Sequence, residues 1–295
     1  MSQVMKLGIG SLILGLVVLG LKLLAWQMTG SIALLSDALE SIVNVATALA
    51  ALAAIRVAAL PADANHTYGH HKAELFSAIL EGVMIILAAI LILRAAWYGL
   101  QQATPLMAPL QGLLDNGADS VLNGVWCWVL IHHGRRHRSP ALVADGRHLM
   151  LDVVSSVGVT FGVLIAIQTG WVWLDPAMAA LVAVNILWGG WKVMQESMSG
   201  LLDESLSQEV LIRVRSVIAL ESVGAVEAHD LRTRSAGAAT FIEFHLVVPG
   251  TITVTAAHAM CDRVEAALKT LVPGCVVTIH VEPEDKAKHA GIIVL

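Results

Sequence analysis

The sequence predicts an α-helical membrane protein with six transmembrane helices, followed by a small cytoplasmic α+β domain. The composition is the first reason: of 295 residues, 57% are hydrophobic and 14% are charged, with a mean hydropathy of +0.74. Soluble domains carry about a quarter charged residues. The second reason is that apolar stretches of roughly 20 residues, the length that crosses a bilayer, recur up to residue 200. Beyond that point, amphipathic helix and strand patterns replace them.

The overall charge and the cysteines exclude other classes. A formal net charge of −5 argues against a nucleic-acid partner, which requires a basic surface. The three cysteines show no CxxC spacing, so we interpret them as reduced packing residues.

The first 200 residues are predicted to form one transmembrane domain, embedded in the lipid bilayer. Arg56, Lys72 and the arginines of 134–140 lie in connections on one side, whereas the opposite connection, 101–112, has no charge. Positive charge marks the cytoplasmic side, so both termini are predicted to be cytoplasmic. The six predicted spans are 7–27, 32–56, 74–100, 113–133, 144–169 and 173–196.

Residues 201–285 are predicted to form the cytoplasmic domain. Amphipathic helices are expected near 206–220 and 253–271, and alternating strands near 226–234, 240–248 and 275–283. The order α-β-β-α-β suits a two-layer α+β domain. Residues 286–295 are expected to be a flexible tail.

Two predicted spans carry polar side chains at matching spacings of i, i+3 and i+7, which place each set on one helix face. The sets are Asp37, Glu40 and Asn44 in the second span, and Asp145, His148 and Asp152 in the fifth. If the two faces meet, four of these side chains would supply one nitrogen and three oxygens to a divalent cation. The four predicted ligands are Glu40, Asn44, His148 and Asp152.

A metal site of this kind would couple metal to protons. Carboxylates that lie together in a low dielectric repel each other and take up protons when no cation is present. A divalent cation displaces those protons, so metal binding and proton release are linked. Asp37 and Asp145 are alternative or supporting ligands. Glu81, in the third span, has no evident partner, and both helix packing and proton relay remain open for it.

Histidines and acids outside the spans form two further groups. Asp63, His66 and His70 are spaced three and four apart in a loop with Pro and Gly, where a turn brings them around one ion. A polar loop with incidental histidines is the alternative. In the last strands, His245 shares a face with Glu243, and His280 shares a face with Glu282.

Four segments resemble the cation diffusion facilitator family, particularly its bacterial zinc–proton antiporters. They are SIALLSDALESIVN, PADANHTYGHHKAE, SPALVADGRHLMLDVVSS and HDLRTRSAG, and the resemblance covers about residues 5–283. It implies a homodimer of six-helix protomers with ferredoxin-like cytoplasmic domains, located in the bacterial inner membrane. Each protomer would export a divalent metal by alternating access in exchange for protons, without enzymatic activity.

The resemblance also assigns metal sites. It places the transport site on Glu40, Asn44, His148 and Asp152, and a loop site on Asp63, His66 and His70. It implies an ion pair between Lys72 and Asp203 that joins the two domains. The residues that match the family's binuclear cytoplasmic site are His229, His245, His258, His280 and Glu282. Metal bound there would crosslink or stiffen the dimer and act as a regulatory ligand that reports the cytoplasmic metal level. Scattered surface histidines without a metal are the alternative.

The second span departs from the family's zinc pattern, which usually has His or Asp followed four residues later by Asp. Glu40 and Asn44 occupy those positions here. More oxygen character loosens the preference for Zn²⁺ and admits Fe²⁺, Co²⁺, Mn²⁺ or Cd²⁺, with Zn²⁺ still first because His148 remains. Two other classes stay open: a membrane-anchored metal sensor or buffer, and an intramembrane metalloenzyme, although the chain lacks HExxH.

Overall fold

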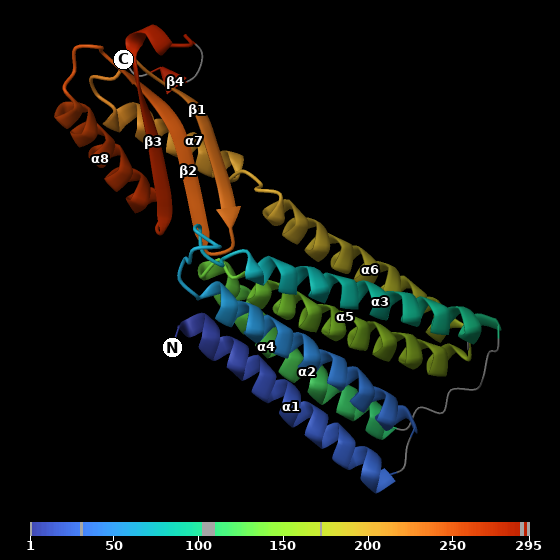
Figure 1. Ribbon diagram of the computed structural model, residues 1–295. Helices are drawn as coiled ribbons and strands as arrows, with labels where there is room; N and C mark the ends of the chain where they lie inside the picture. Colours follow the sequence, from blue (N-terminus) through green and yellow to red (C-terminus); the bar gives the residue numbers. More distant parts are fainter. Residues whose placement is uncertain (1, 30–31, 102–109, 172, 290–291, 294–295) are drawn as a thin grey trace. The chain divides into compact units, whose positions relative to one another are not determined.

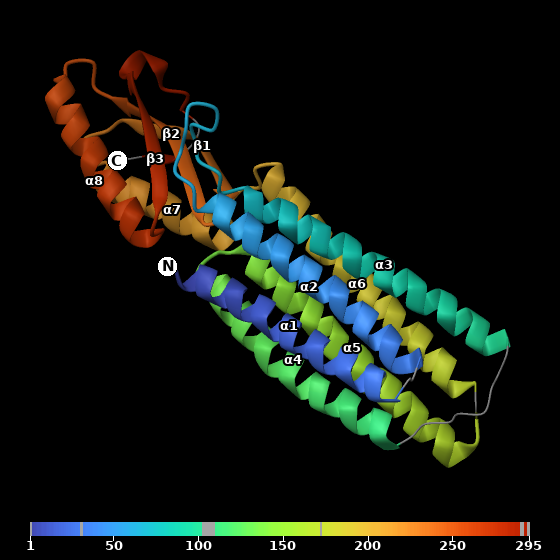
Figure 2. The ribbon, with the colours of Figure 1, turned by 60° about the horizontal axis from the view of Figure 1, so that its bottom comes forward.

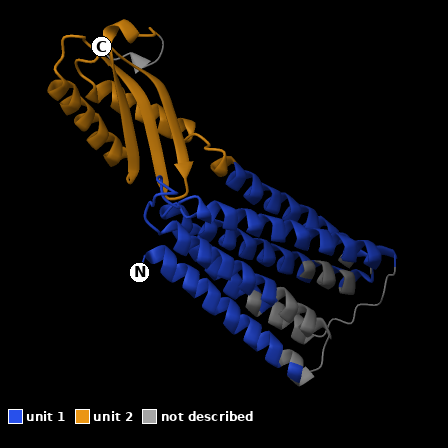
Figure 3. Cartoon of the chain, viewed as in Figure 1, with its two compact units in different colours: residues 1–198 blue, residues 199–295 orange. Residues whose placement is uncertain are grey.

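The computed structural model describes residues 2–29, 32–101, 110–171, 173–289 and 292–293. The chain divides into two compact units, residues 1–198 and 199–295 (Figure 3). The first unit is helical and the second combines two helices with a sheet.

The first unit is a bundle of six long helices that run alongside one another (Figures 1 and 2). Each coincides with one of the predicted apolar stretches. The helices are α1 (Gln3–Thr29), α2 (Ile32–Ala58), α3 (Ala73–Gln101), α4 (Leu110–Arg136), α5 (Pro140–Thr169) and α6 (Leu174–Leu201). Within the described residues, four segments are long and apolar enough to cross a membrane: Gln3–Leu24, Ser41–Ala58, Ala73–Gln101 and Pro176–Leu201.

Local sequence explains the start of α5. Pro140 is its first residue, where the missing N–H costs no hydrogen bond and the fixed φ suits a helix. The hydroxyl of Ser139, directly before it, accepts a hydrogen bond from the backbone N–H of Leu142 at 3.4 Å. The same hydroxyl donates to the buried carboxylate of Glu74 at the start of α3. This contact links the α4–α5 turn to α3.

Glycines allow α4 and α5 to pack closely. A Cβ on Gly146 would lie 2.7 Å from Ile131 Cγ1 and 3.1 Å from the backbone nitrogen of Ile131. A Cβ on Gly134 would lie 2.9 Å from Val143 Cγ2. Small residues at such crossings let helix backbones approach within a membrane bundle. The close approach holds the polar face of α5 in a defined position.

The substitution Gly146→Leu is expected to destabilise the protein by about 1–3 kcal/mol, because the added side chain has no space between α4 and α5. Thermal unfolding in detergent measures the effect. Gly20→Leu on α1 is the matched control, because a Cβ there meets nothing within 4 Å. Equal melting temperatures for the two variants would contradict the expectation.

The second unit has the predicted order α-β-β-α-β. Its elements are α7 (Gln208–Glu221), β1 (Glu227–Ala236), β2 (Ala239–Val248), α8 (Val254–Leu271), β3 (Cys275–Pro283), the short helix η1 (Glu284–Lys286) and β4 (Ile292–Ile293). The strand order is β3-β2-β1-β4. β1 and β2 are antiparallel neighbours, and α8 connects β2 to β3, which run parallel.

The two faces of this sheet differ. Ile242, Phe244 and Leu246 of β2 point to the core beneath α7 and α8, together with Val264 and Leu268 of α8. Alternate residues of a strand face opposite sides, so the other face carries His245 and, in register with it, His229 and His280.

The C-terminal residues have contacts that the sequence did not predict. β4 pairs antiparallel with β1, with Ile293 opposite Glu227. Lys288 donates a hydrogen bond to Asp230 at 2.6 Å, and the backbone N–H of His289 donates to Glu227 at 2.9 Å. Residues 288–289 and 292–293 therefore contact β1, while the flexibility expected for residues 286–295 stays a prediction.

Candidate metal sites

Three of the four predicted transport-site residues converge between α2 and α5. Asn44 Nδ2 donates to Asp152 Oδ2 at 3.5 Å, which joins the two helices. His148 Nε2 lies 3.9 Å from Asp152 Oδ1, one turn further along α5. Their polar atoms therefore meet inside the bundle.

The fourth predicted ligand, Glu40, and the alternative ligand Asp37 lie outside the residues whose side chains the structure describes. The backbone of α2 is helical there, so Glu40 precedes Asn44 by about one turn. Their roles remain predictions.

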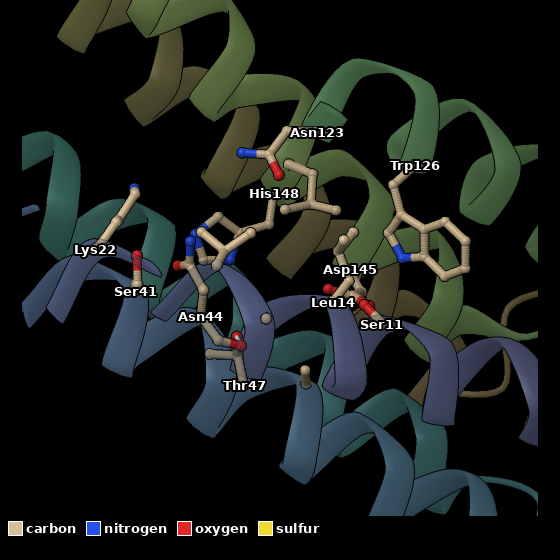
Figure 4. Close-up of a pocket in the computed structure, with 14 residues that line it drawn as sticks. Ser11, Leu14, Lys22, Ser41, Asn44, Thr47, Asn123, Trp126, Asp145 and His148 are labelled. Carbon is tan, nitrogen blue, oxygen red and sulfur yellow. Dashed lines mark hydrogen bonds between the residues drawn. The ribbon is translucent and has the colours of Figure 1, made fainter. Parts of the chain in front are cut away.

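A pocket opens beside this cluster. Asn44 and His148 line it, together with Ser11 and Lys22 of α1 (Figure 4). Asp145 also lines it but is 5% exposed and accepts a hydrogen bond from Ser11 Oγ at 2.6 Å. The structure thus pairs Asp145 with α1, and its role as an alternative ligand remains untested.

Sequence reasoning left Glu81 without a partner, and the structure supplies one. Its carboxylate is 2% exposed and forms a short hydrogen bond with His148 Nδ1. The contact joins α3 to α5, and spacing along one helix cannot reveal it. The sequence offered one signal for this contact: an acid inside an apolar helix requires a polar partner.

The loop between α2 and α3 brings its three predicted ligands together. His66 Nδ1 lies 3.2 Å from Asp63 Oδ1, and His70 Nε2 lies 3.4 Å from Asp63 Oδ2. One ligand atom from each residue lies within 4.8 Å of the others, which allows all three to bind one ion. The loop is polar and largely exposed.

We expect the pKa of Asp63 to lie below its ordinary value of 3.8 in the metal-free protein. The main cause is a hydrogen bond of 2.7 Å from the backbone N–H of His66, helped by one of 2.9 Å from Asn65. A lowered pKa means that the turn gains stability above pH 3.8 and loses it as pH falls through the folded value. A carboxyl-carbon NMR titration measures the pKa, with a peptide of residues 57–72 as the unfolded control. Identical titrations would refute the expectation.

In the second unit, one carboxylate lies among three predicted histidines. Glu282 Oε2 is 3.2 Å from His229 Nε2, while Glu282 Oε1 is 3.3 Å from His245 Nδ1 and 3.6 Å from His280 Nε2. The three histidines come from adjacent strands at the same register. Four of the five predicted cytoplasmic ligands therefore lie together.

Buried polar atoms in this group lack hydrogen-bond partners among the described residues. They are both ring nitrogens of His229, Nδ1 of His245 and Oε1 of Glu227. Glu227 is 3% exposed, and its Oε1 lies 3.5 Å from His229 Nδ1 without hydrogen-bond alignment. Buried polar groups usually have partners, so such a group is consistent with a cation site. Glu227 was not predicted from the sequence.

His258 lies on the other side of the sheet from these four residues. It projects from α8 beside Ile279 and Val281 of β3, and its Nε2 is 3.7 Å from Asp262. Because Ile279 and His280 are consecutive in a strand, they face opposite sides. Within one chain His258 does not join the cluster.

The ion pair predicted between Lys72 and Asp203 would join the two units, and it remains a prediction. Within the second unit, Asp203 has a φ of 60° and its Oδ1 lies 3.5 Å from Arg234 Nη1.

Comparisons with known proteins cover nearly the whole chain. Residues 9–202 match the cation efflux transmembrane domain, and residues 206–284 match the cytoplasmic domain of cation efflux proteins. An uncharacterized transporter of Synechocystis sp., sll1263, is 44% identical over 273 residues, covering 92% of this chain and 88% of that protein. The cation-efflux pump FieF of Cronobacter sakazakii is 31% identical over 270 residues, covering 89% of this chain and 87% of that protein.

Solved structures resemble parts of the chain. CzrB in its Zn form is 48% identical and covers 29% of this chain and 98% of its own, with a TM-score of 0.28. The metal-bound C-terminal domain of the CzcD transporter from Thermotoga maritima is 23% identical and covers 28% of this chain and 100% of its own, with a TM-score of 0.26. TM-scores this low establish no shared fold. The two domain matches and the relatives do establish the family: the chain belongs to the cation diffusion facilitators, the cation efflux transporters, and is not an enzyme.

Proposed function

We propose that this protein is a proton-coupled antiporter that exports divalent transition metals, with Zn²⁺ as the first candidate substrate. Family membership supports divalent metal export. Beyond metal export, we propose that protons are the coupling ion, that transport follows an alternating-access cycle and that Zn²⁺ is the first candidate metal. The protein would lie in a bacterial inner membrane with both termini in the cytoplasm.

One observation carries the proposal. Asn44, His148 and Asp152 bring amide, imidazole and carboxylate groups together between α2 and α5, inside a helical bundle of a metal-exporting family. Glu40, one turn before Asn44, would complete a four-ligand site with one nitrogen and three oxygens. Groups of this kind bind metal in the deprotonated state, so release of the metal leaves proton-binding sites behind.

The proposed antiporter also has an expected architecture. All six helices of the first unit would span the bilayer, and the second unit would be a ferredoxin-like cytoplasmic domain. The protein would act as a homodimer, in which Lys72 and Asp203 link the two units.

The two groups outside the helices would bind metal in supporting roles. Asp63, His66 and His70 would hold a metal in the cytoplasmic loop. His229, His245, His280 and Glu282 would bind cytoplasmic metal and stabilise the dimer. His258 lies on the other face of the sheet, so it would reach such a site only from a second copy of the chain.

Flux into proteoliposomes tests the proposal. The full chain, reconstituted with a pH-sensitive dye, should move protons on addition of Zn²⁺, and parallel runs with Fe²⁺, Co²⁺, Mn²⁺ and Cd²⁺ should rank the metals. Collapsing the pH gradient should remove the proton-driven part of metal accumulation. Metal flux that is indifferent to the gradient would disprove the coupling, and absence of flux for all five metals would disprove the function.

A metal buffer is the second candidate, because two of the three groups lie outside the spanning helices. Expression in a metal-sensitive host separates the candidates. Tolerance that survives alanine at both His148 and Asp152 would favour buffering, whereas tolerance that survives His70→Ala and His245→Ala but not Asp152→Ala favours export.

A further inference from the structure

We infer that Glu81 is a positioning residue for the transport site: from α3 it holds the His148 imidazole so that Nε2 faces the metal. This inference rests on the proposed function, because it takes His148 as a ligand of the transported ion. It assigns a role to a buried acid that the four-ligand site does not use.

The contact distinguishes the two ring nitrogens of His148. Glu81 binds Nδ1 of His148, while Nε2, on the opposite edge of the ring, lies 3.9 Å from Asp152 Oδ1. Asp152 in turn accepts from Asn44 at 3.5 Å. The imidazole therefore has its carboxylate support on one side and the predicted ligands on the other.

This arrangement decides which nitrogen binds metal. A neutral imidazole carries one N–H and one lone pair. If Nδ1–H donates to Glu81, the lone pair is on Nε2, which faces Asp152. A carboxylate behind a ligating histidine fixes the ring and raises its basicity, and loss of such a partner typically costs about 10–100-fold in metal affinity or activity.

The surrounding packing keeps Glu81 directed inward. The next residue, Gly82, has no side chain, and a Cβ there would lie 3.0 Å from the backbone nitrogen of Met194 and 3.1 Å from the Gly190 carbonyl oxygen of α6. α6 therefore packs closely against α3 at the residue next to Glu81. The carboxylate is 2% exposed and His148 is 8% exposed, so little water competes for the bond.

A matched pair of buried acids on α3 makes the inference testable. Glu74, 5% exposed, bonds to Ser139 and to the backbone N–H of Ala141 instead of to His148. Glu74→Gln and Glu74→Met thus remove a buried carboxylate from the same helix without a change at the imidazole. Glu81→Gln and Glu81→Met remove the one that supports it.

Metal-dependent flux of the reconstituted full chain is the first measurement. Glu81→Met should raise the Zn²⁺ concentration for half-maximal flux about 10–100-fold with maximal flux nearly unchanged. Glu81→Gln should raise it about 3–10-fold, since a neutral acceptor makes a hydrogen bond roughly half as strong. Both Glu74 variants should show the same half-maximal Zn²⁺ concentration as the parent, once flux is corrected for the fraction of protein that folds.

Co²⁺ binding gives a readout independent of transport. It uses full-length protein carrying His70→Ala and His245→Ala, which weaken the other two sites. The visible ligand-field spectrum of bound Co²⁺ should shift in Glu81→Met and stay unchanged in Glu74→Met. A structural role alone would lower the folded fraction without shifting the spectrum.

The outcomes separate the two proposals. Co²⁺ binding that responds to Glu81 in a protein without flux would refute antiport and support the positioning role. Unchanged half-maximal concentration and spectrum in both Glu81 variants would overturn the positioning role, as would equal changes in the Glu74 variants. If Glu81→Met does not fold, Glu81→Gln decides, and parent-like behaviour of that variant overturns the inference.

Discussion

Asp152→Ala is expected to reduce metal-dependent proton flux to the level of empty liposomes. Asp152 lies near both Asn44 and His148, so its loss removes a proposed ligand and the hydrogen bond between α2 and α5. Asp152→Asn should fail as well, because an amide keeps the shape of the side chain but neither carries negative charge nor releases a proton. Fluorescence of a trapped pH dye after Zn²⁺ addition measures both variants.

The control for this experiment is another acid that contacts α5. Glu196 of α6 is partly exposed and pairs with Arg147 at 2.6 Å. Exposed ion pairs contribute about 0–1 kcal/mol, so Glu196→Gln should fold and transport normally. Parent-like flux in Asp152→Asn would show that the transport site lies elsewhere.

Glu282→Gln is expected to lower the Zn²⁺ affinity of the second unit more than about 100-fold. Loss of a residue that only supports a ligand typically costs about 10–100-fold, and Glu282 is predicted to bind the metal itself. Its two oxygens approach three imidazoles within 3.6 Å, so a single substitution removes the central anionic donor. Calorimetric titration of a fragment of residues 199–295 measures the affinity. This unit has its own hydrophobic core, which supports independent folding.

Glu284→Gln is the matched control, because Glu284 is exposed in η1 just beyond β3. It should bind Zn²⁺ like the unmodified fragment. A Zn²⁺ affinity of Glu282→Gln within threefold of that control would remove Glu282 from the site. Binding should be stronger in samples that dimerise if His258 of a second copy contributes.

Much of the fold was predictable because its signals are local. Apolar stretches of bilayer length coincide with α1 to α6, and the change to alternating patterns marks the sheet of the second unit. Asn44, His148 and Asp152, which belong to the rows at i, i+3 and i+7, lie near one another between α2 and α5, and their role as ligands stays a prediction. The loop spacing likewise brought Asp63 and His70 within reach of one ion.

The partners of several buried groups were not predictable. Glu81 meets His148 and Ser11 meets Asp145 across helices that are distant in sequence. Such contacts depend on how each helix is rotated about its axis and on strand register, and neither follows from one segment alone.

The sequence by itself determined the class of protein, the helices and the chemical groups available for metal, because hydropathy and side-chain spacing are properties of short segments. Only the tertiary structure decided which groups meet. Close α3–α6 and α4–α5 packing through glycines brings a carboxylate to Nδ1 of His148, and the sheet separates His258 from the other histidines. The physical reason is that contacts between elements depend on the packing of all of them at once.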